Sequence, residues 1–564
     1  MINKFFKILD FINISKIYLF FIILIAAILV LLEIFGLGFF QLIILQIFET
    51  KGETVNSFLL FLTNFIETNF SDNNISIIIF FFSFFFILKS FVSIVLNTIH
   101  FNFIKKVHQN LLFKNFNLLL KKNYLNFIKN NNIYYNQLFS RYSEYFVKNV
   151  LGSLIKITTD SFFVLCVLFY LFTIDPFLIS KAVFFIFSFA LIYIYLIKKF
   201  LKKNSERIGI AEENYKFTIY EYIKNFREIY LYNLKPKITE KFNQNSKSFT
   251  RYEKNYLILS NTGKYIFEIL IIFFISLYLY QNIGDNFNEY QLSAAITLAF
   301  AVIKMMPYLN SLNHSISQLY QSYYSIKNIY DFISDKTLIS NVTKKISKKN
   351  KIKKIEVTNI HFSFNNKTIL KKTNLLLKRN NIYILKGKSG SGKTTFIDLL
   401  TGIIKPDYGK IKFIDNNNKF INNFNNFSYI SQTPNLFYGT VKYNLTLGKK
   451  EINSKFISHI IQELELDNQG TLNENFVISE DGKNISGGQR QKISIARSLV
   501  QDRDVLLYDE VTSGLDTESE KKVINVIEKY SKNKIIIFIS HKDKILFNKK
   551  SNILLLTNGK IKKI

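Results

Sequence analysis

The first half of the chain alternates long apolar runs with polar segments. The runs cover about 17–48, 75–99, 150–174, 177–197, 266–280 and 292–309. A helix needs roughly 20 mostly apolar residues to cross a membrane, and the first run lacks the small-residue cleavage site of a removed signal peptide. The pattern therefore predicts six membrane spans, of which the third and fourth are joined by a tight turn at Asp175 and Pro176.

Charge is unevenly distributed over the segments between these runs. Segments 51–74, 173–176 and 281–291 contain six acidic residues but only one basic residue, whereas segments 100–149 and 198–262 are rich in Lys and Arg. Basic loops remain on the cytosolic side of a membrane. We therefore expect a multi-pass protein of a bacterial inner membrane, with both termini in the cytosol.

The basic segments are too long to be turns and keep an apolar spacing typical of helices. They predict membrane helices that continue into the cytosol and fold back through short crosswise helices near 124–131 and 222–232. A soluble helical bundle is the alternative for these segments. Residues 57–66 are apolar but too short to cross, so they suit either a helix on the outer membrane surface or a loop helix packed on the bundle.

A Lys-rich polar linker, 335–354, follows the last run. After it, short apolar strands alternate with helices, a pattern typical of an α/β domain. The sequence thus predicts an α-helical six-span membrane domain with long cytosolic extensions (1–334), the linker, and an α/β domain (355–564) that the motifs below identify as a P-loop ATPase domain.

The strongest chemical signal lies in 387–395, which reads GKSGSGKTT. This is a phosphate-binding loop: its glycines let backbone N–H groups turn toward phosphate oxygens, its lysine adds a positive charge, and its hydroxyl can bind Mg²⁺. An apolar strand at 382–385 precedes it and a helix at 395–400 is expected after it, with its N-terminus facing the anion. The nucleotide-binding candidates here are Gly387, Ser389, Gly390, Gly392, Lys393, Thr394 and Thr395. ATP and Mg²⁺ are the expected cofactors, and a glycine-rich surface turn is the alternative.

Composition changes the picture little. A formal net charge of +32 would suit nucleic-acid binding, but the excess lies largely in the expected cytosolic loops, so we expect no nucleic-acid partner. The one cysteine, Cys166, excludes an internal disulfide framework.

Further motifs surround the loop in a fixed order. Gln432 follows an apolar strand, 485–489 reads ISGGQ, 505–510 reads VLLYDE, 513–516 reads SGLD, and His541 follows the strand at 535–540. With these motifs, the segment from 355 onward resembles the ATPase domain of ABC transporters. The six preceding spans resemble the membrane half of an exporter-type half transporter.

The resemblance implies roles for individual residues. Glu510 would be the base that polarises the attacking water, with Gln432 and His541 assisting as catalytic residues, while Thr394, Gln432 and Asp509 would hold Mg²⁺. Segment 480–482 resembles a loop that touches the membrane helices in exporters. The nucleotide-binding residues implied outside the phosphate loop are Phe364, which would stack on adenine, and Ser486, Gly487, Gly488, Gln489 and Asp516.

The ISGGQ segment forms a second phosphate cradle that cannot reach its own phosphate loop in the family's geometry. The resemblance therefore implies a head-to-tail homodimer with two shared ATP sites.

Three lysines lie in or beside the apolar runs: Lys89, Lys264 and Lys304. Charges within spans are costly and usually face a cavity or a partner. They could pair with Glu33 and Glu268, or Lys264 could extend to the inner membrane surface. Alternatively, they could line a site for an anionic headgroup such as a pyrophosphate. The step Lys304-Met305-Met306-Pro307 resembles lipid-linked oligosaccharide flippases.

The sequence therefore predicts an ATPase that exports or flips an amphipathic substrate, with an anionic lipid or lipid-linked oligosaccharide as the best-supported class. A peptide or drug exporter is the alternative within the same class. An ATP-gated regulator or channel that does not pump is the alternative from another class.

Overall fold

The computed structural model describes residues 2–13, 16–47, 62–63, 75–122, 124–128, 130–172, 176–282, 289–335, 351–364, 367–421, 426–466, 472–540, 547 and 551–564. Contacts divide the chain into two compact parts. The first, here the helical domain, is 1–122 with 126–338; the second, here the α/β domain, is 339–564 with 123–125. Most of the predicted linker, 336–350, lies outside the described residues.

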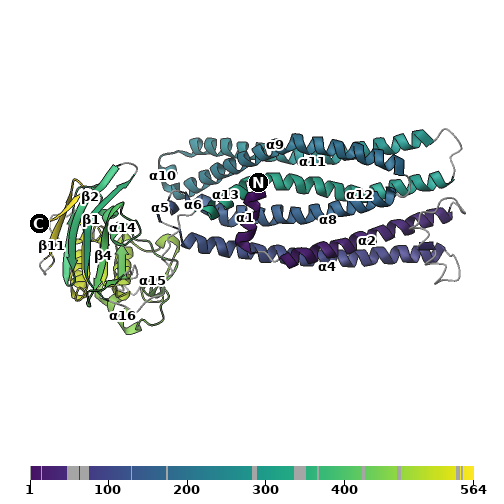
Figure 1. The fold of residues 1–564 in the computed structure, drawn as a ribbon. Helices are drawn as coiled ribbons and strands as arrows, with labels where there is room; N and C mark the ends of the chain where they lie inside the picture. Colours follow the sequence, from purple (N-terminus) through teal and green to yellow (C-terminus); the bar gives the residue numbers. More distant parts are fainter. Residues whose placement is uncertain are drawn as a thin grey trace. The chain divides into compact units, whose positions relative to one another are not determined.

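The helical domain is built from long helices that run roughly side by side (Figure 1). They are α2 (Lys16–Ile47), α4 (Ile75–Leu120), α8 (Gly152–Phe172), α9 (Pro176–Lys224), α11 (Lys235–Asn282) and α12 (Glu289–Gln321). The shorter helices are α1 (Ile2–Ile12), α5 (Tyr124–Phe127), α6 (Asn132–Gln137), α7 (Ser143–Tyr145), α10 (Phe226–Leu231) and α13 (Tyr323–Ser334). Two π-helical stretches, Leu138–Tyr142 and Phe146–Leu151, flank α7.

Three helices are far longer than a membrane requires. Helices α4, α9 and α11 contain 46, 49 and 48 residues, so each rises about 70 Å at 1.5 Å per residue. The hydrocarbon core of a bilayer is only roughly 30 Å thick. More than half of each helix must project beyond it, which confirms the long extensions predicted from the sequence.

Three stretches of the described residues are long and apolar enough to cross a membrane: Leu24–Ile44, Ser76–Leu120 and Asn132–Phe172. The fourth, fifth and sixth predicted spans fall within α9, α11 and α12. The count of six spans therefore stays a prediction.

Short helices stand where the chain was expected to fold back. Helix α5 lies within 124–131 and α10 within 222–232. Of the predicted outer helix at 57–66, only Leu62 and Thr63 are described, and both are helical.

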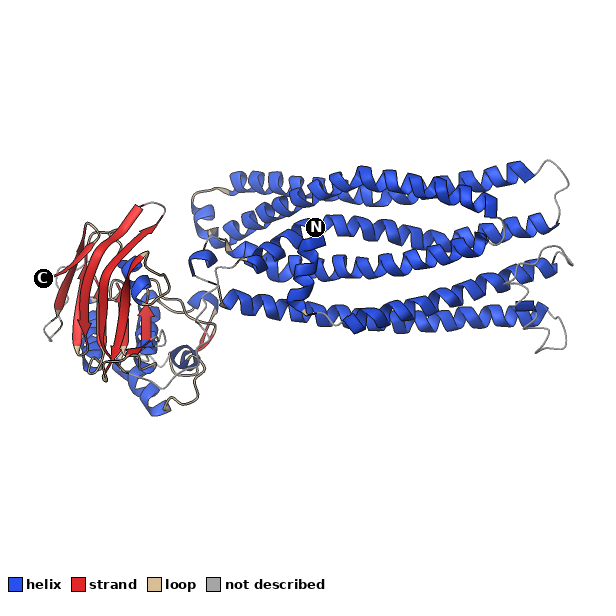
Figure 2. Cartoon of the chain, viewed as in Figure 1, coloured by secondary structure: helices blue, strands red, loops and turns tan. Residues whose placement is uncertain are grey.

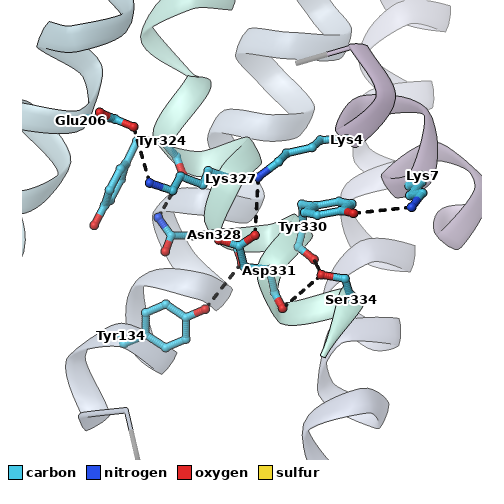
Figure 3. A network of polar contacts seen from close by, with 10 residues as sticks. All are labelled: Lys4, Lys7, Tyr134, Glu206, Tyr324, Lys327, Asn328, Tyr330, Asp331 and Ser334. Carbon is cyan, nitrogen blue, oxygen red and sulfur yellow. Dashed lines mark hydrogen bonds and ion pairs between the residues drawn. The ribbon is translucent and has the colours of Figure 1, made fainter. Parts of the chain in front are cut away.

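The N-terminal helix α1 packs across the bundle against α13. Ile8 and Ile12 are buried in a cluster that includes Ile329. Lys4 forms a 3.5 Å ion pair with Asp331 (Figure 3). Helix α1 therefore contacts α13, the last helix before the linker, through both buried apolar side chains and a basic one.

The α/β domain contains three sheets (Figure 2). An antiparallel sheet has the order β2-β1-β4-β5, a six-stranded sheet the order β12-β11-β3-β10-β9-β6, and a small one joins β7 to β8. The strands are β1 (Ile352–Phe364), β2 (Lys367–Lys378), β3 (Asn381–Lys386), β4 (Tyr408–Asp415), β5 (Phe420–Ile421), β6 (Phe427–Ile430), β7 (Gly439–Thr440), β8 (Val477–Ile478), β9 (Val505–Asp509), β10 (Ile535–Ile539), β11 (Asn552–Thr557) and β12 (Lys560–Lys563).

Parallel pairing in the six-stranded sheet positions the candidate site residues of this domain. Strands β11, β3, β10, β9 and β6 pair in parallel, and β9 and β10 are buried along their whole length. Parallel strands buried on both faces have nearly continuous apolar sequences, and this explains the apolar runs before the phosphate loop and before Asp509. The helices of the domain are α14 (Lys393–Leu400), α15 (Val441–Thr446), α16 (Ser454–Glu463), α17 (Gly487–Val500) and α18 (Thr517–Lys529).

Candidate nucleotide site

The phosphate loop connects β3 to α14, as its sequence predicts. Gly390 and Gly392 have φ angles of +73° and +101°, a region that side chains disfavour. A Cβ on Gly392 would also lie 2.4 Å from Ile369 Cγ2. The loop therefore requires glycine at position 392, and this backbone turn directs the first N–H groups of α14 toward the loop.

Two polar side chains of the loop fit a bound phosphate. Lys393 is buried, and its Nζ donates to the carbonyl oxygens of Gly387 (2.8 Å) and Lys388 (3.1 Å). Burial lowers the pKa of Lys393, against the opposing effect of Glu510 and Asp509. The Ser391 hydroxyl is buried, and no described residue is its hydrogen-bond partner. Phosphate oxygens would satisfy both groups.

The carboxylates lie where β9 ends. Asp509 accepts a hydrogen bond from the Tyr429 hydroxyl (3.2 Å) and another from the side chain of Thr394. Burial raises the pKa of Asp509. The predicted metal ligands Thr394 and Asp509 are therefore in contact, one from the phosphate loop and one from the strand.

Gln432 and Glu510 form the other half of this site. Gln432 Nε2 donates to Glu510 Oε2 at 2.8 Å, so two residues predicted to be catalytic are brought together. Within the described ranges no group of three His, Cys, Asp or Glu residues could hold a metal ion. Mg²⁺ commonly keeps several waters and needs only one or two protein ligands besides phosphates, so a pair such as Thr394 and Asp509 fits it.

Sequence reasoning gave no role to two residues of this site. Tyr429 bonds Asp509 directly, and Asp398 on α14 has its pKa raised to about 6, first by burial and then by Asp509. Tyr429 lies on β6, three residues before Gln432, and Asp398 is the only acidic residue of α14. These two features of the sequence could have indicated that both residues lie near the site.

The second cradle begins α17. Ser486 caps this helix by accepting from the Gln489 N–H (3.2 Å), and the Gln489 side chain accepts from the Ser486 N–H (2.8 Å). A Cβ on Gly487 would meet nothing within 4 Å, so the helix N-terminus can be approached closely there; one on Gly488 would contact Leu515 at 3.4 Å. This helix end is open to an anion, which is the geometry that the prediction requires.

For the other predicted residues, the structure gives less direct support for a role in nucleotide binding. Phe364 ends β1 with an exposed side chain, as stacking on a base requires. Asp516 caps α18 by accepting from the Ser519 N–H (3.0 Å), which lowers its pKa. His541 lies outside the described residues. The nucleotide roles of Phe364 and Asp516 stay predictions.

The three lysines of the helical domain contact other side chains. Lys89 pairs with buried Glu33, and Lys264 pairs with Glu268 at 3.8 Å. Lys304 lies 4.3 Å from the ring centre of Phe86, over which Lys89 also lies, at 5.8 Å. The pairings with glutamate are those that the sequence suggested.

These features define a P-loop nucleotide site, and comparison with known proteins specifies it. A family model described as ABC transporter matches residues 370–513. The C-terminal domain therefore matches the ATPase domain of ABC transporters over these residues, and we call it the ATPase domain from here on.

The fold of the whole chain matches a solved structure of a bacterial Atm1-family ABC exporter with ATP bound. The TM-score is 0.78 at 14% identity, and the match covers 96% of this chain and 93% of the other. The chain thus has the fold of an exporter-type ABC half transporter, which confirms the fold class predicted from the sequence.

Curated relatives match more limited stretches. The ATP-dependent lipid A-core flippase of Wigglesworthia glossinidia brevipalpis is 28% identical over 65% of this chain and 64% of its own length. ABC transporter B family member 1 of Dictyostelium discoideum is 32% identical over 50% of this chain and 31% of its own. A putative export ATP-binding/permease protein of Rickettsia typhi is 28% identical over 62% and 60%. Each match spans less than two thirds of the relative.

Proposed function

We propose that the chain is an ATP-driven exporter or flippase that works as a homodimer in a bacterial inner membrane. The observation that carries the proposal is the nucleotide site, in which Gln432 bonds Glu510 beside the hydrogen-bonded pair of Thr394 and buried Asp509. That site lies in a chain whose other half contains helices long and apolar enough to cross a membrane.

The site contains what ATP hydrolysis requires. Lys393 and the backbone N–H groups of the loop would bind the phosphates, and Thr394 with Asp509 would hold Mg²⁺, which supplies charge neutralisation on the transferred phosphate. Glu510 would accept the proton of the attacking water. The amide of Gln432, 2.8 Å from Glu510, holds that carboxylate in place.

The open N-terminus of α17 supports the homodimer. Ser486 and Gln489 complete each other's hydrogen bonds, and Gly487 leaves the helix end clear. Such an end attracts an anion, and the phosphate loop of the same domain precedes a different helix, α14. We infer that α17 closes over ATP held by a second copy of the chain.

For the substrate we propose an amphipathic lipid with an anionic headgroup. Lys304 lies 4.3 Å from the ring centre of Phe86. Lys89 pairs with Glu33, whereas among the described residues no acidic side chain forms an ion pair with Lys304. A cation without an acidic partner within a predicted span favours a bound anion. Several curated relatives, including those of Wigglesworthia glossinidia brevipalpis and Haemophilus ducreyi, are named lipid A-core flippases.

Reconstitution tests this proposal. The full chain in vesicles should move an acyl-chain-labelled phosphatidylglycerol between leaflets when ATP is supplied, measured by chemical quenching of the outer leaflet. Glu510→Gln is the matched control and should show no movement. Movement without ATP would favour a channel, whereas ATP-dependent movement of a labelled peptide but of no lipid would favour a peptide exporter.

A further inference from the structure

A cavity of about 480 Å³ lies inside the helical domain, and its lining does not include Lys89, Lys264 or Lys304. It is bounded by α2, α4, α8 and α12 together with the second π-helical stretch. Its size is typical of small-molecule sites, which occupy roughly 300–1,000 Å³. Apolar side chains such as Leu29, Val30 and Leu96 line part of it, and ionisable side chains line the rest.

Asp160 is the acidic residue of this lining. It is only 8% exposed and lies within a predicted span, on α8. The Thr159 hydroxyl donates to its Oδ1 at 3.3 Å, and Ser311 on α12 lies beside the carboxylate. Its Oδ2 is buried, and no described residue donates a hydrogen bond to it. A carboxylate so placed in a membrane span is costly unless it has a partner.

Among the described residues, no lysine forms a direct ion pair with Asp160. Lys148, which also lines the cavity, pairs with Glu144 at 2.6 Å. Lys156 stands one helical turn before Asp160, but among the described residues no ion pair within 4.0 Å joins them. A lysine that precedes an acid by four residues is the less favourable order for pairing along a helix.

The cavity therefore presents both signs of charge, because Lys156 and Asp160 lie one turn apart on α8. Lys156 can face an anionic group, and Asp160 offers an acceptor oxygen to a donor with positive charge. A hydrogen bond between two ionised groups is roughly twice as strong as a neutral one. A hydroxyl group would gain less from Asp160 than a primary ammonium group.

We propose that this cavity binds the headgroup of a zwitterionic amphiphile and that Asp160 accepts the hydrogen bonds of its primary ammonium group. The phosphate of such a headgroup lies toward Lys156, and an acyl chain lies along Leu29, Val30 and Leu96. This inference rests on the proposed function and deepens it, because it adds a preference for a primary ammonium group to an amphipathic substrate with an anionic phosphate.

Binding selectivity tests the inference. The probes are acyl-chain-labelled phosphatidylethanolamine and phosphatidylcholine with the same chains, measured by fluorescence anisotropy with the purified full chain in detergent. Both headgroups are zwitterionic, but only the first has N–H donors. Wild-type protein should bind phosphatidylethanolamine about 10-fold more tightly, the ratio that corresponds to ~1.4 kcal/mol.

Variants then assign the preference to Asp160. Asp160→Asn should bind both lipids with equal affinity, whereas Asp10→Asn, which removes an exposed carboxylate from α1, should keep the wild-type ratio. Equal affinities in the wild type, or an unchanged ratio in Asp160→Asn, would overturn the inference. If Asp160→Asn does not fold, the ratio of the two lipid affinities in the wild type still tests the inference.

The vesicle assay separates this inference from the proposed function. If phosphatidylglycerol is moved with ATP but the ammonium group adds no affinity, Asp160 has no role in recognition and the exporter proposal stands. If neither phosphatidylglycerol nor phosphatidylethanolamine is moved in the vesicles when ATP is supplied, the proposed function itself fails.

Discussion

The polar groups of the ATPase domain and those of the helical domain are positioned in different ways. In the ATPase domain they lie at the ends of elements: Asp509 ends a strand, Lys393 begins a helix and Ser486 caps one. In the helical domain they lie in the middle of helices, as Glu33 and Asp160 do, and depend on side chains of other helices. Backbone geometry positions the first set, whereas packing between helices positions the second.

The largest effect that tests this comparison is expected from Glu510→Gln. The amide keeps the size of the side chain but cannot accept a proton, so ATP hydrolysis should fall by roughly 10²–10⁴-fold, the usual contribution of a general base. ATP binding should persist, because the loop and Lys393 are unchanged. Steady-state phosphate release and ATP titration measure the two quantities.

An exposed acid in the same domain provides the control. Glu518→Gln removes a carboxylate on α18 whose side chain is 77% exposed, and it should hydrolyse ATP at the wild-type rate. Wild-type hydrolysis by Glu510→Gln would show that another group is the base.

In the helical domain, Glu33→Gln should have the next largest effect. Glu33 is 3% exposed, pairs with Lys89 and accepts from the Tyr308 hydroxyl at 3.2 Å. Removing one partner of a buried ion pair leaves the other charge uncompensated and costs about 3–5 kcal/mol. We expect a markedly lower midpoint of thermal unfolding in detergent.

Glu221→Gln is the matched variant for this experiment. The pair Lys241–Glu221 joins α11 to α9 at 2.7 Å outside the apolar runs, and its side chains are 50% and 45% exposed. Solvent-exposed pairs contribute only about 0–1 kcal/mol, so the midpoint should barely move. Equal effects of the two variants would show that burial does not decide which pair matters.

The same distinction explains how much the sequence could predict. The phosphate loop was predicted from residue types at a fixed spacing along one strand–turn–helix unit, and the structure has that unit. The roles of Glu510 and Ser486 were implied by the family resemblance and stay predictions. The contact of Tyr429 with Asp509 was not predicted, because it joins strands β6 and β9, 80 residues apart. Pairing between strands of a parallel sheet is not encoded in local spacing.

The helical domain shows the same limit more strongly. Its helices and their great length follow from apolar periodicity, and the pairing of Lys89 with Glu33 was one of two open alternatives. Asp160 received no role, although it is a lone acid in an apolar run, because only the packing of α8 against α12 shows its surroundings.

A smaller effect is expected from glycine substitutions in the phosphate loop. Gly392→Ala combines a φ of +101° with a contact of 2.4 Å to Ile369 Cγ2. Strain of this kind costs about 1–3 kcal/mol, so ATP affinity should fall by roughly 5- to 150-fold. Gly390→Ala has a φ of +73° but an open Cβ position, so its loss, measured by the same ATP titration, should be smaller. A larger loss in Gly390→Ala would contradict this order.

The smallest predicted effect concerns the pH dependence of stability. The pKa of Asp398 is raised from an ordinary 3.8 to about 6 by burial and by Asp509. The folded state therefore binds a proton that the unfolded state has already released at about pH 4–6. Stability contributed by this group is present below that window and is lost as the pH rises through it.

Asp398→Asn removes this titration, so its stability relative to wild type should increase as the pH rises from about 4 to about 7. Scanning calorimetry of the full chain at a series of pH values measures the difference in the unfolding midpoint. Glu451→Gln changes the charge equally at an exposed position, and its difference from wild type should stay flat. Asp398 lies on the helix that follows the phosphate loop, close to Asp509 at the end of β9. A flat profile for Asp398→Asn would mean that the end of β9 is more open to water than its burial indicates. The polar groups of the ATPase domain would then differ less from those of the helical domain than the comparison states.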